Sequence, residues 1–161
     1  MIQSNEQFVT SALRRRGHVC TILIGLALVI QHISIFTSTS EVPLHWGADG
    51  EADAYGSPWL TLIVWVVLAA CVALCKFVAA HVDVQYWNRP SKVQPGDLDR
   101  WYAHSMSVLY NVNLMISILT LGIAVLYALH AYWLMFPFII IAAIVIIAYS
   151  IYANFNWKRA S

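Results

Sequence analysis

Residues 132–153, YWLMFPFIIIAAIVIIAYSIYA, decide the fold, because they run without a single charged side chain. A helix that crosses a hydrocarbon core of about 30 Å, at about 1.5 Å per residue, needs about 20 residues of this kind. Three further apolar runs of similar length precede this one, at residues 17–36, 59–80 and 107–129. The sequence therefore predicts four membrane-spanning segments.

The composition of the whole chain agrees with this prediction. Of its 161 residues, 60% are hydrophobic and 11% are charged, and the mean hydropathy is +0.68. Soluble chains are about 45–50% apolar and about 25% charged. Backbone groups in lipid must satisfy their own hydrogen bonds, and the alternating segments of about 10 residues that a barrel needs are not seen. We predict an all-α integral membrane four-helix bundle, formed by a single domain of residues 1–161.

Two helix boundaries need a separate argument. Arginines before the run 17–36 are also typical of a signal peptide, but this run is longer than an h-region of about 7–15 residues. No small-residue cleavage site clearly follows it, so we expect a retained membrane helix. The third helix is expected to begin near residue 97, because Asp97 and Asp99 would then lie at the positive end of its dipole.

The charged residues predict the orientation in the membrane. Cytoplasmic segments are enriched in Lys and Arg. All nine basic residues fall on the side that holds both termini and the connection 81–106, or close to it: Arg14, Arg15, Arg16, Lys76, Arg89, Lys92, Arg100, Lys158 and Arg159. The other side carries acidic residues only: Glu41, Asp49, Glu51 and Asp53. We expect a protein of the cell inner (plasma) membrane with both termini cytoplasmic and with residues 37–58 as an ordered extracytoplasmic loop.

That outer loop is the main candidate for recognition. Its stretch 43–57, PLHWGADGEADAYGS, combines glycines that permit tight turns with aromatic rings that favour the membrane interface. We expect the loop to fold back over the outer ends of the helices. The residues predicted to bind a partner or ligand are His45, Trp46, Asp49, Gly50, Asp53, Tyr55 and Gly56.

A divalent metal is the alternative use of the same loop. The spacing of Asp49, Glu51 and Asp53 is similar to the opening of a calcium loop, but Ala54 and Leu60 replace the glycine and the final glutamate, which excludes an EF-hand. A looser site would combine imidazoles and carboxylates of the outer side. Its ligands would be His45, Asp49, Asp53, His32 and His130. We favour the interpretation that the acids cap turns through backbone N–H groups, and no cofactor is otherwise expected.

The order of residues in the loop also carries a family resemblance. The pattern P43-x-H45-W46-x-x-x-G50-x-x-D53-x-Y55-G56-S57, followed by a membrane helix, resembles the bacterial membrane family called domain of unknown function 1648. That domain is also found in SdpI-type immunity and signalling proteins. The likeness covers residues 20–80 and implies that His45 and Asp53 are the important loop positions. Pro58 and Trp59 depart from the pattern, because family members often carry a basic residue there.

Polar residues within the predicted helices have two interpretations. Gln31, His32, Asn111 and Asn113 are expected to form hydrogen bonds between helices. A proton or ion path is the alternative, but no Asp, Glu or Arg is predicted near the middle of the membrane to support it. Cys20, Cys71 and Cys75 are expected to act as small apolar residues.

These patterns favour a binding role over catalysis. We predict a non-enzymatic multi-pass membrane protein that binds a partner or ligand through its acidic outer loop, in immunity, sensing or signalling. The alternatives are a small accessory subunit of a larger membrane complex and a metal-binding protein or enzyme of the outer face. The expected partners are membrane lipid and another membrane or extracytoplasmic protein. Nucleic acid is not expected, since the basic residues serve the orientation.

Overall fold

The computed structural model describes residues 5–83, 86–87 and 93–157 and is mostly helical. Its long helices are α1 (Ser11–Thr37), α2 (Thr61–His81), α3 (Leu98–Ala128) and α4 (Met135–Asn156). All four are long and apolar enough to cross a membrane, which confirms the predicted all-α membrane bundle. Arg89, Lys92, Lys158 and Arg159, which contributed to the predicted orientation, lie outside the described residues.

Local sequence explains where the helices begin. The side chain of Thr10 accepts a hydrogen bond from the Leu13 backbone N–H and caps α1, so this helix starts before the apolar run that predicted it. Helix α3 begins at Leu98, as its acidic start predicts, and therefore extends well beyond the run 107–129. Short 3₁₀ turns precede the other helices, at Pro58–Leu60 before α2 and at Tyr132–Leu134 before α4.

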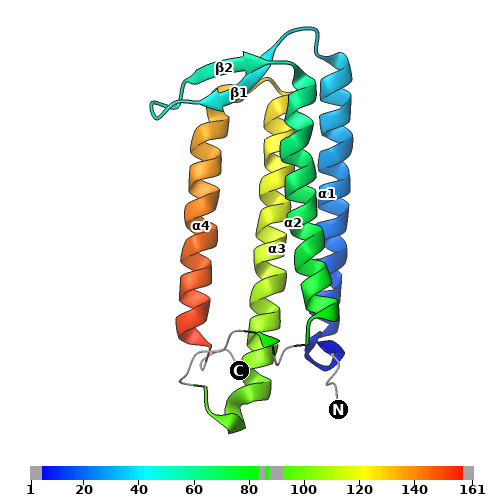
Figure 1. The fold of residues 1–161 in the computed structure, drawn as a ribbon, viewed down its shortest axis with the longest axis vertical. Coiled ribbons are helices and arrows are strands. Elements are labelled where there is room, and N and C mark those ends of the chain that lie inside the picture. The colour runs from blue at the N-terminus through cyan, green and yellow to red at the C-terminus, as the bar shows by residue number, and fades with distance from the viewer. Residues whose placement is uncertain (1–4, 84–85, 88–92, 158–161) are drawn as a thin grey trace.

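The connection between α1 and α2, predicted as an ordered loop, contains regular structure that the sequence did not predict. It forms an antiparallel hairpin of β1 (Val42–Trp46) and β2 (Ala52–Gly56). Figure 1 shows this hairpin lying across one end of the helices, here called the hairpin end. The turn Asn5–Phe8 and the C-terminal end of α4 lie at the other end, here called the terminal end.

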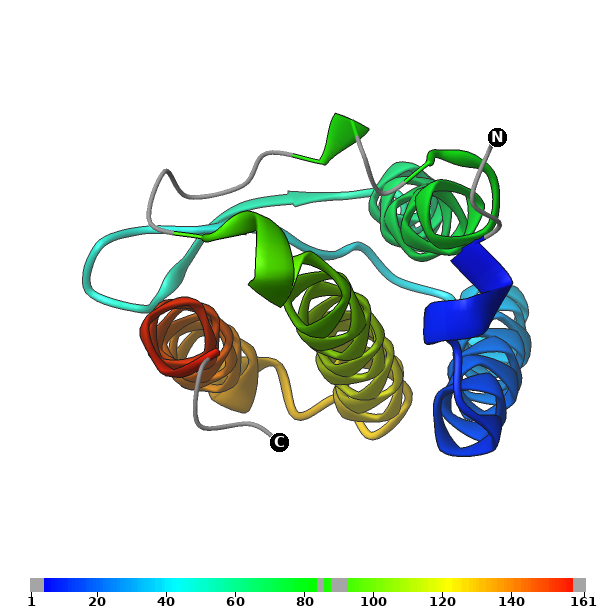
Figure 2. The same cartoon turned by 90° about the horizontal axis from the view of Figure 1, so that it is seen from below.

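Helix α3 is the central element. Seen end-on in Figure 2, α1 and α4 lie on opposite sides of α3, and α2 lies beside α1 and α3. Helix α1 has by far the most extensive contact with α3, whereas α4 packs mainly against α3. The helices therefore do not share one common core, and the buried apolar residues form three separate clusters along the bundle.

Small and polar residues form the seam between α1 and α3. On α3, Asn113, Ser117, Thr120 and Ala124 are almost fully buried and share one helix face at i, i+4, i+7 and i+11. On α1, the buried residues include Gly17, Cys20, Ala27 and Gln31. A Cβ atom at Gly17 would lie 3.1 Å from the ring of Tyr110 on α3. Small side chains of this kind allow two membrane helices to approach closely.

A different small residue sets the contact between α3 and α4. A Cβ atom at Gly122 would collide with the ring of Phe138 on α4. Real Cβ atoms do not approach other atoms so closely, so either this ring or the helix would have to move. Gly25 on α1, by contrast, has nothing within 4 Å of the same position.

This difference predicts unequal effects of two glycine-to-alanine substitutions. Gly122→Ala forces extra volume against Phe138 and is expected to lower the free energy of unfolding by about 1–3 kcal/mol. Gly25→Ala fills open space and is expected to leave stability unchanged or raise it by up to about 1 kcal/mol. Thermal unfolding of both variants in the same detergent measures the difference, and equal stabilities would contradict the predicted α3–α4 contact.

Candidate functional site

The hairpin at the predicted recognition loop is shaped by its glycines and by Asp49. The N–H of Gly47 donates to the carbonyl of Glu51 over 2.8 Å, and the N–H of Gly50 donates to the carbonyl of Gly47 over 3.0 Å. Oδ1 of Asp49 accepts from the Glu51 N–H at 3.0 Å, which confirms the predicted turn-capping role of this acid. Gly50 has φ +82°, a conformation that other residues rarely adopt.

The hairpin is fixed to the helices beneath it. Tyr127 near the end of α3 donates its phenolic O–H to the carbonyl of Pro43 over 2.6 Å, and this contact is buried. Val42 belongs to the same cluster of buried residues as Trp65 and Tyr127. At the tip, a Cβ atom on Gly50 would lie 3.2 Å from the ring of Phe136 on α4. The predicted return of the loop over the helix ends is therefore observed, with partners on α2, α3 and α4.

The side of the hairpin that points away from these contacts carries the predicted recognition residues. Nδ1 of His45 lies 2.6 Å from Oδ1 of Asp53, and the two side chains are 68% and 53% exposed. An ion pair at such exposure contributes about 0–1 kcal/mol, so it does not hold the hairpin together. Tyr55 on β2 is 58% exposed. The structure thus brings His45, Asp53 and Tyr55 onto one small hairpin that is stabilised by other residues.

The remaining predicted recognition residues have structural contacts. Trp46 packs against the cluster that contains Trp65, and Gly50 faces Phe136. A Cβ atom at Gly56 would lie 2.5 Å from the Leu44 side chain, so this glycine allows the strands to pack there. Together with the turn residue Asp49, these positions determine the shape of the hairpin.

The alternative metal site is not assembled. Among residues 5–83, 86–87 and 93–157, no three His, Cys, Asp or Glu side chains gather closely enough to hold a metal ion. Nδ1 of His32 lies 2.8 Å from the Leu28 carbonyl of its own helix, and Nδ1 of His130 lies 2.9 Å from the Tyr132 hydroxyl. Among the described residues, the alternative in which these histidines join His45, Asp49 and Asp53 is therefore not observed, because a shared end of the bundle does not place ligands on a shared surface.

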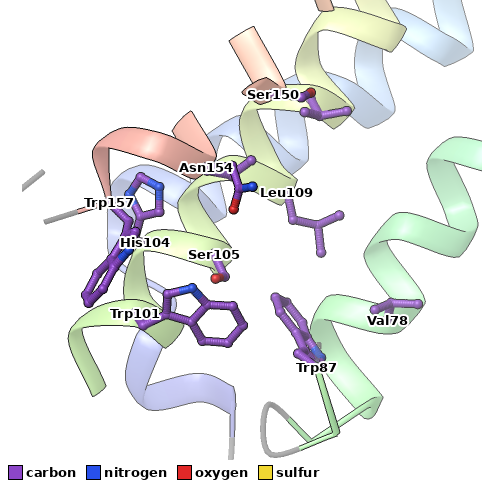
Figure 3. A pocket seen from close by; sticks show the side chains of 11 residues that line it. Val78, Trp87, Trp101, His104, Ser105, Leu109, Ser150, Asn154 and Trp157 are labelled. Atoms are coloured by element: carbon purple, nitrogen blue, oxygen red, sulfur yellow. The ribbon is translucent and has the colours of Figure 1, made fainter. Parts of the chain in front are cut away.

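Two of the apolar cavities among the described residues lie against α3. One, of about 440 Å³, lies beneath the hairpin and is lined by residues that include Trp46, Trp65 and Met135. The other, of about 420 Å³, lies at the terminal end, where Figure 3 shows three tryptophan rings around it, from Trp87, Trp101 and Trp157. In its described part, the predicted connection 81–106 contributes Trp87 and Trp101 to this cavity.

Polar contacts between helices include one that the sequence did not reveal. The predicted interhelical role of Gln31 is confirmed by its hydrogen bond of 2.8 Å to Thr61 on α2. Asn111 accepts a hydrogen bond of 2.7 Å from Nη1 of Arg16 and donates one of 2.6 Å to the Tyr149 hydroxyl. Arg16 was assigned only to orientation, because the apolar run suggested that the helix begins after it. The capped start of α1 was the signal that could have placed Arg16 within the helix.

The fold and this surface define a class of protein. Among the described residues, four apolar helices and a hairpin that is fixed by Tyr127, a contact here called the clamp, are the features of a multi-pass membrane protein with an ordered surface at one end of its helices. Residues 22–70 match the family model described as Domain of unknown function (DUF1648). The comparisons with curated proteins and with solved structures gave no match. The matched segment contains the hairpin and the parts of α1 and α2 that lead into and out of it.

The clamp on the hairpin leads to a stability prediction. Tyr127→Phe leaves the buried Pro43 carbonyl without its donor and is expected to lower the free energy of unfolding by about 1–3 kcal/mol. Tyr132→Phe is the matched control, because its hydroxyl is hydrogen-bonded to the exposed His130 instead of to a buried carbonyl. Thermal unfolding combined with limited proteolysis of the hairpin distinguishes the two, and the clamp is refuted if both variants behave like the wild type.

Proposed function

We propose that this chain is a non-enzymatic plasma-membrane protein that binds another protein through the exposed face of its hairpin. The resemblance to SdpI-type proteins supports a role in immunity, sensing or signalling. The partner is a membrane or extracytoplasmic protein, because residues 42–56 lie at an end of the helices and not among them.

One observation carries this proposal: the hairpin is held by buried contacts, while His45, Asp53 and Tyr55 remain exposed. A surface that is already ordered loses little conformational entropy when a partner binds. Aromatic residues surrounded by polar groups are also frequent at the centre of protein interfaces. Because the His45–Asp53 pair adds little to stability, its position is better explained by recognition than by folding.

Charge supports an extracytoplasmic position for the hairpin. Asp49, Glu51 and Asp53 lie on it, and Glu41 directly precedes it. Arg14, Arg15 and Arg16 lie in the first turns of α1, toward the terminal end. By the positive-inside rule, this asymmetry supports a cytoplasmic position of the terminal end.

An accessory subunit of a larger complex is the second candidate function. The observation that favours it is α4, which packs mainly against α3 and has few buried residues. Its exposed side chains include Ile140, Ile144 and Ile151. In this case the chain would be scarce in cells that lack its partner subunits, whereas a self-contained binding protein would accumulate normally.

The orientation can be tested with single cysteines introduced at exposed positions of a variant in which Cys20, Cys71 and Cys75 are replaced by alanine. Ala48→Cys places a thiol at the tip of the hairpin, and Gly96→Cys places one before α3, where a Cβ atom meets nothing within 4 Å. A membrane-impermeant maleimide is expected to label Ala48→Cys in intact cells and Gly96→Cys only after permeabilisation. The reverse pattern would place the hairpin in the cytoplasm.

The binding role can be tested by purification from native membranes in mild detergent, followed by mass spectrometry. His45→Ala and Asp53→Ala are each expected to reduce recovery of the bound partner about tenfold, as at a central contact of an interface. Glu41→Ala is the matched control, because this acid is exposed but lies outside the two strands. If both hairpin variants recover the bound partner at the wild-type level, the proposal that the hairpin face binds this partner is contradicted.

A further inference from the structure

Three side chains from three helices form a hydrogen-bonded relay toward the terminal end. Arg16 of α1 donates through Nη1 to Oδ1 of Asn111 on α3 over 2.7 Å. Asn111 in turn donates through Nδ2 to the hydroxyl oxygen of Tyr149 on α4 over 2.6 Å. All three side chains are half-buried, so the relay remains partly accessible from outside the bundle.

The direction of these bonds leaves donors unused. Because the Tyr149 oxygen accepts from Asn111, its own O–H proton is available to another acceptor. Arg16 uses one of its five N–H donors on Asn111. No carboxylate within the described part of the chain pairs with this guanidinium, since its interactions are confined to Asn111. The Arg16 guanidinium and the Tyr149 O–H are therefore held by the same asparagine, and the described residues provide no anion for them.

The positions of Arg16 and Tyr149 along the apolar runs indicate which kind of anion could reach them. Arg16 directly precedes the apolar run of α1, and Tyr149 lies seven residues before the end of α4 at Asn156, which corresponds to about 10 Å along the helix. Arg16 thus lies next to the limit of the run 17–36, and Tyr149 lies inside the run 132–153, about 6 Å from its end at four residues and about 1.5 Å per residue. A cation at this depth is costly unless it is paired or reaches the interface.

We propose that Arg16 and Tyr149 bind a phosphate group, with Asn111 as the positioning residue that orients both. Guanidinium groups form strong charge-assisted hydrogen bonds with phosphate oxygens, and the tyrosine hydroxyl adds a directional donor. The chemistry is that of a phosphate anion, supplied either by the headgroup of an anionic phospholipid or by soluble phosphate. This site is independent of the hairpin and of the partner proposed for it.

Native mass spectrometry of the delipidated full chain, offered equal amounts of phosphatidylglycerol and phosphatidylcholine, tests the proposal. Wild-type protein is expected to retain phosphatidylglycerol preferentially. Arg16→Gln is expected to reduce this preference about fivefold. Arg15→Gln is the matched control, because it removes the same charge from the adjacent, exposed position and leaves the preference unchanged. Equal losses from both variants would overturn the site in favour of general electrostatic attraction.

Two further variants separate binding from a structural role of the relay. Tyr149→Phe removes one donor and is expected to weaken the preference, whereas Tyr152→Phe, on the 66% exposed tyrosine of the same helix, is not. Asn111→Asp supplies Arg16 with a carboxylate and is expected to abolish the preference while the protein keeps its unfolding temperature. If Asn111→Asp keeps the preference for phosphatidylglycerol, the hydrogen bonds of Asn111 only hold the helices together and do not form the phosphate site.

Inorganic phosphate distinguishes the two sources of the anion. It is added in excess to the phosphatidylglycerol-bound wild-type protein. Displacement of the lipid would assign the site to soluble phosphate as well as to headgroups. If the wild type retains phosphatidylglycerol in excess phosphate and Arg16→Gln does not bind it, the site is assigned to the phospholipid. Absence of any lipid preference in the wild type, together with no phosphate binding, would overturn the proposal.

Discussion

The close contact between α1 and α3 is the constraint on which the other contacts depend. Membrane helices gain little from apolar burial, because lipid tails are as apolar as the side chains, and they associate through close packing and hydrogen bonds. Ser117, Thr120 and Ala124 on α3 and Ala27 on α1 are nearly inaccessible and small enough for such an approach. Helix α3 is thereby fixed, and the other helices and the hairpin use it as their support.

The hairpin illustrates this dependence. An isolated two-stranded hairpin is marginally stable in water, and this one has irregular pairing on both sides of His45. It remains ordered because Tyr127 binds Pro43 from below and Phe136 packs under Gly50. The exposed side chains of the hairpin therefore contribute little to its stability. This separation of support from display is what makes the surface suitable for recognition.

The sequence predicts the helices well and their contacts poorly. Length and hydropathy predict all four membrane helices, and Asp97 with Asp99 predicts the start of α3. The hairpin was missed, because glycines and a proline in residues 43–57 are as typical of an irregular loop, and the strand register depends on Tyr127, which is distant in sequence. Within the described part of the chain, the alternative metal site is not assembled, and the contact between Arg16 and Asn111 was not predicted, for a related reason. Periodicity places residues along a helix but does not show which neighbour each residue faces.

The extent of the family match separates two parts of this architecture. Residues 22–70 include the hairpin, Gln31 and its partner Thr61, so the family model covers the hairpin and the adjoining parts of α1 and α2. Tyr127 and Phe136, which hold the hairpin from below, lie outside that segment, as do Arg16, Asn111 and Tyr149. The matched segment thus carries the exposed face of the hairpin, α3 and α4 supply its support, and the proposed phosphate site combines residues of α1, α3 and α4. A change in the support can therefore alter how the hairpin is held without changing any residue that a partner would contact.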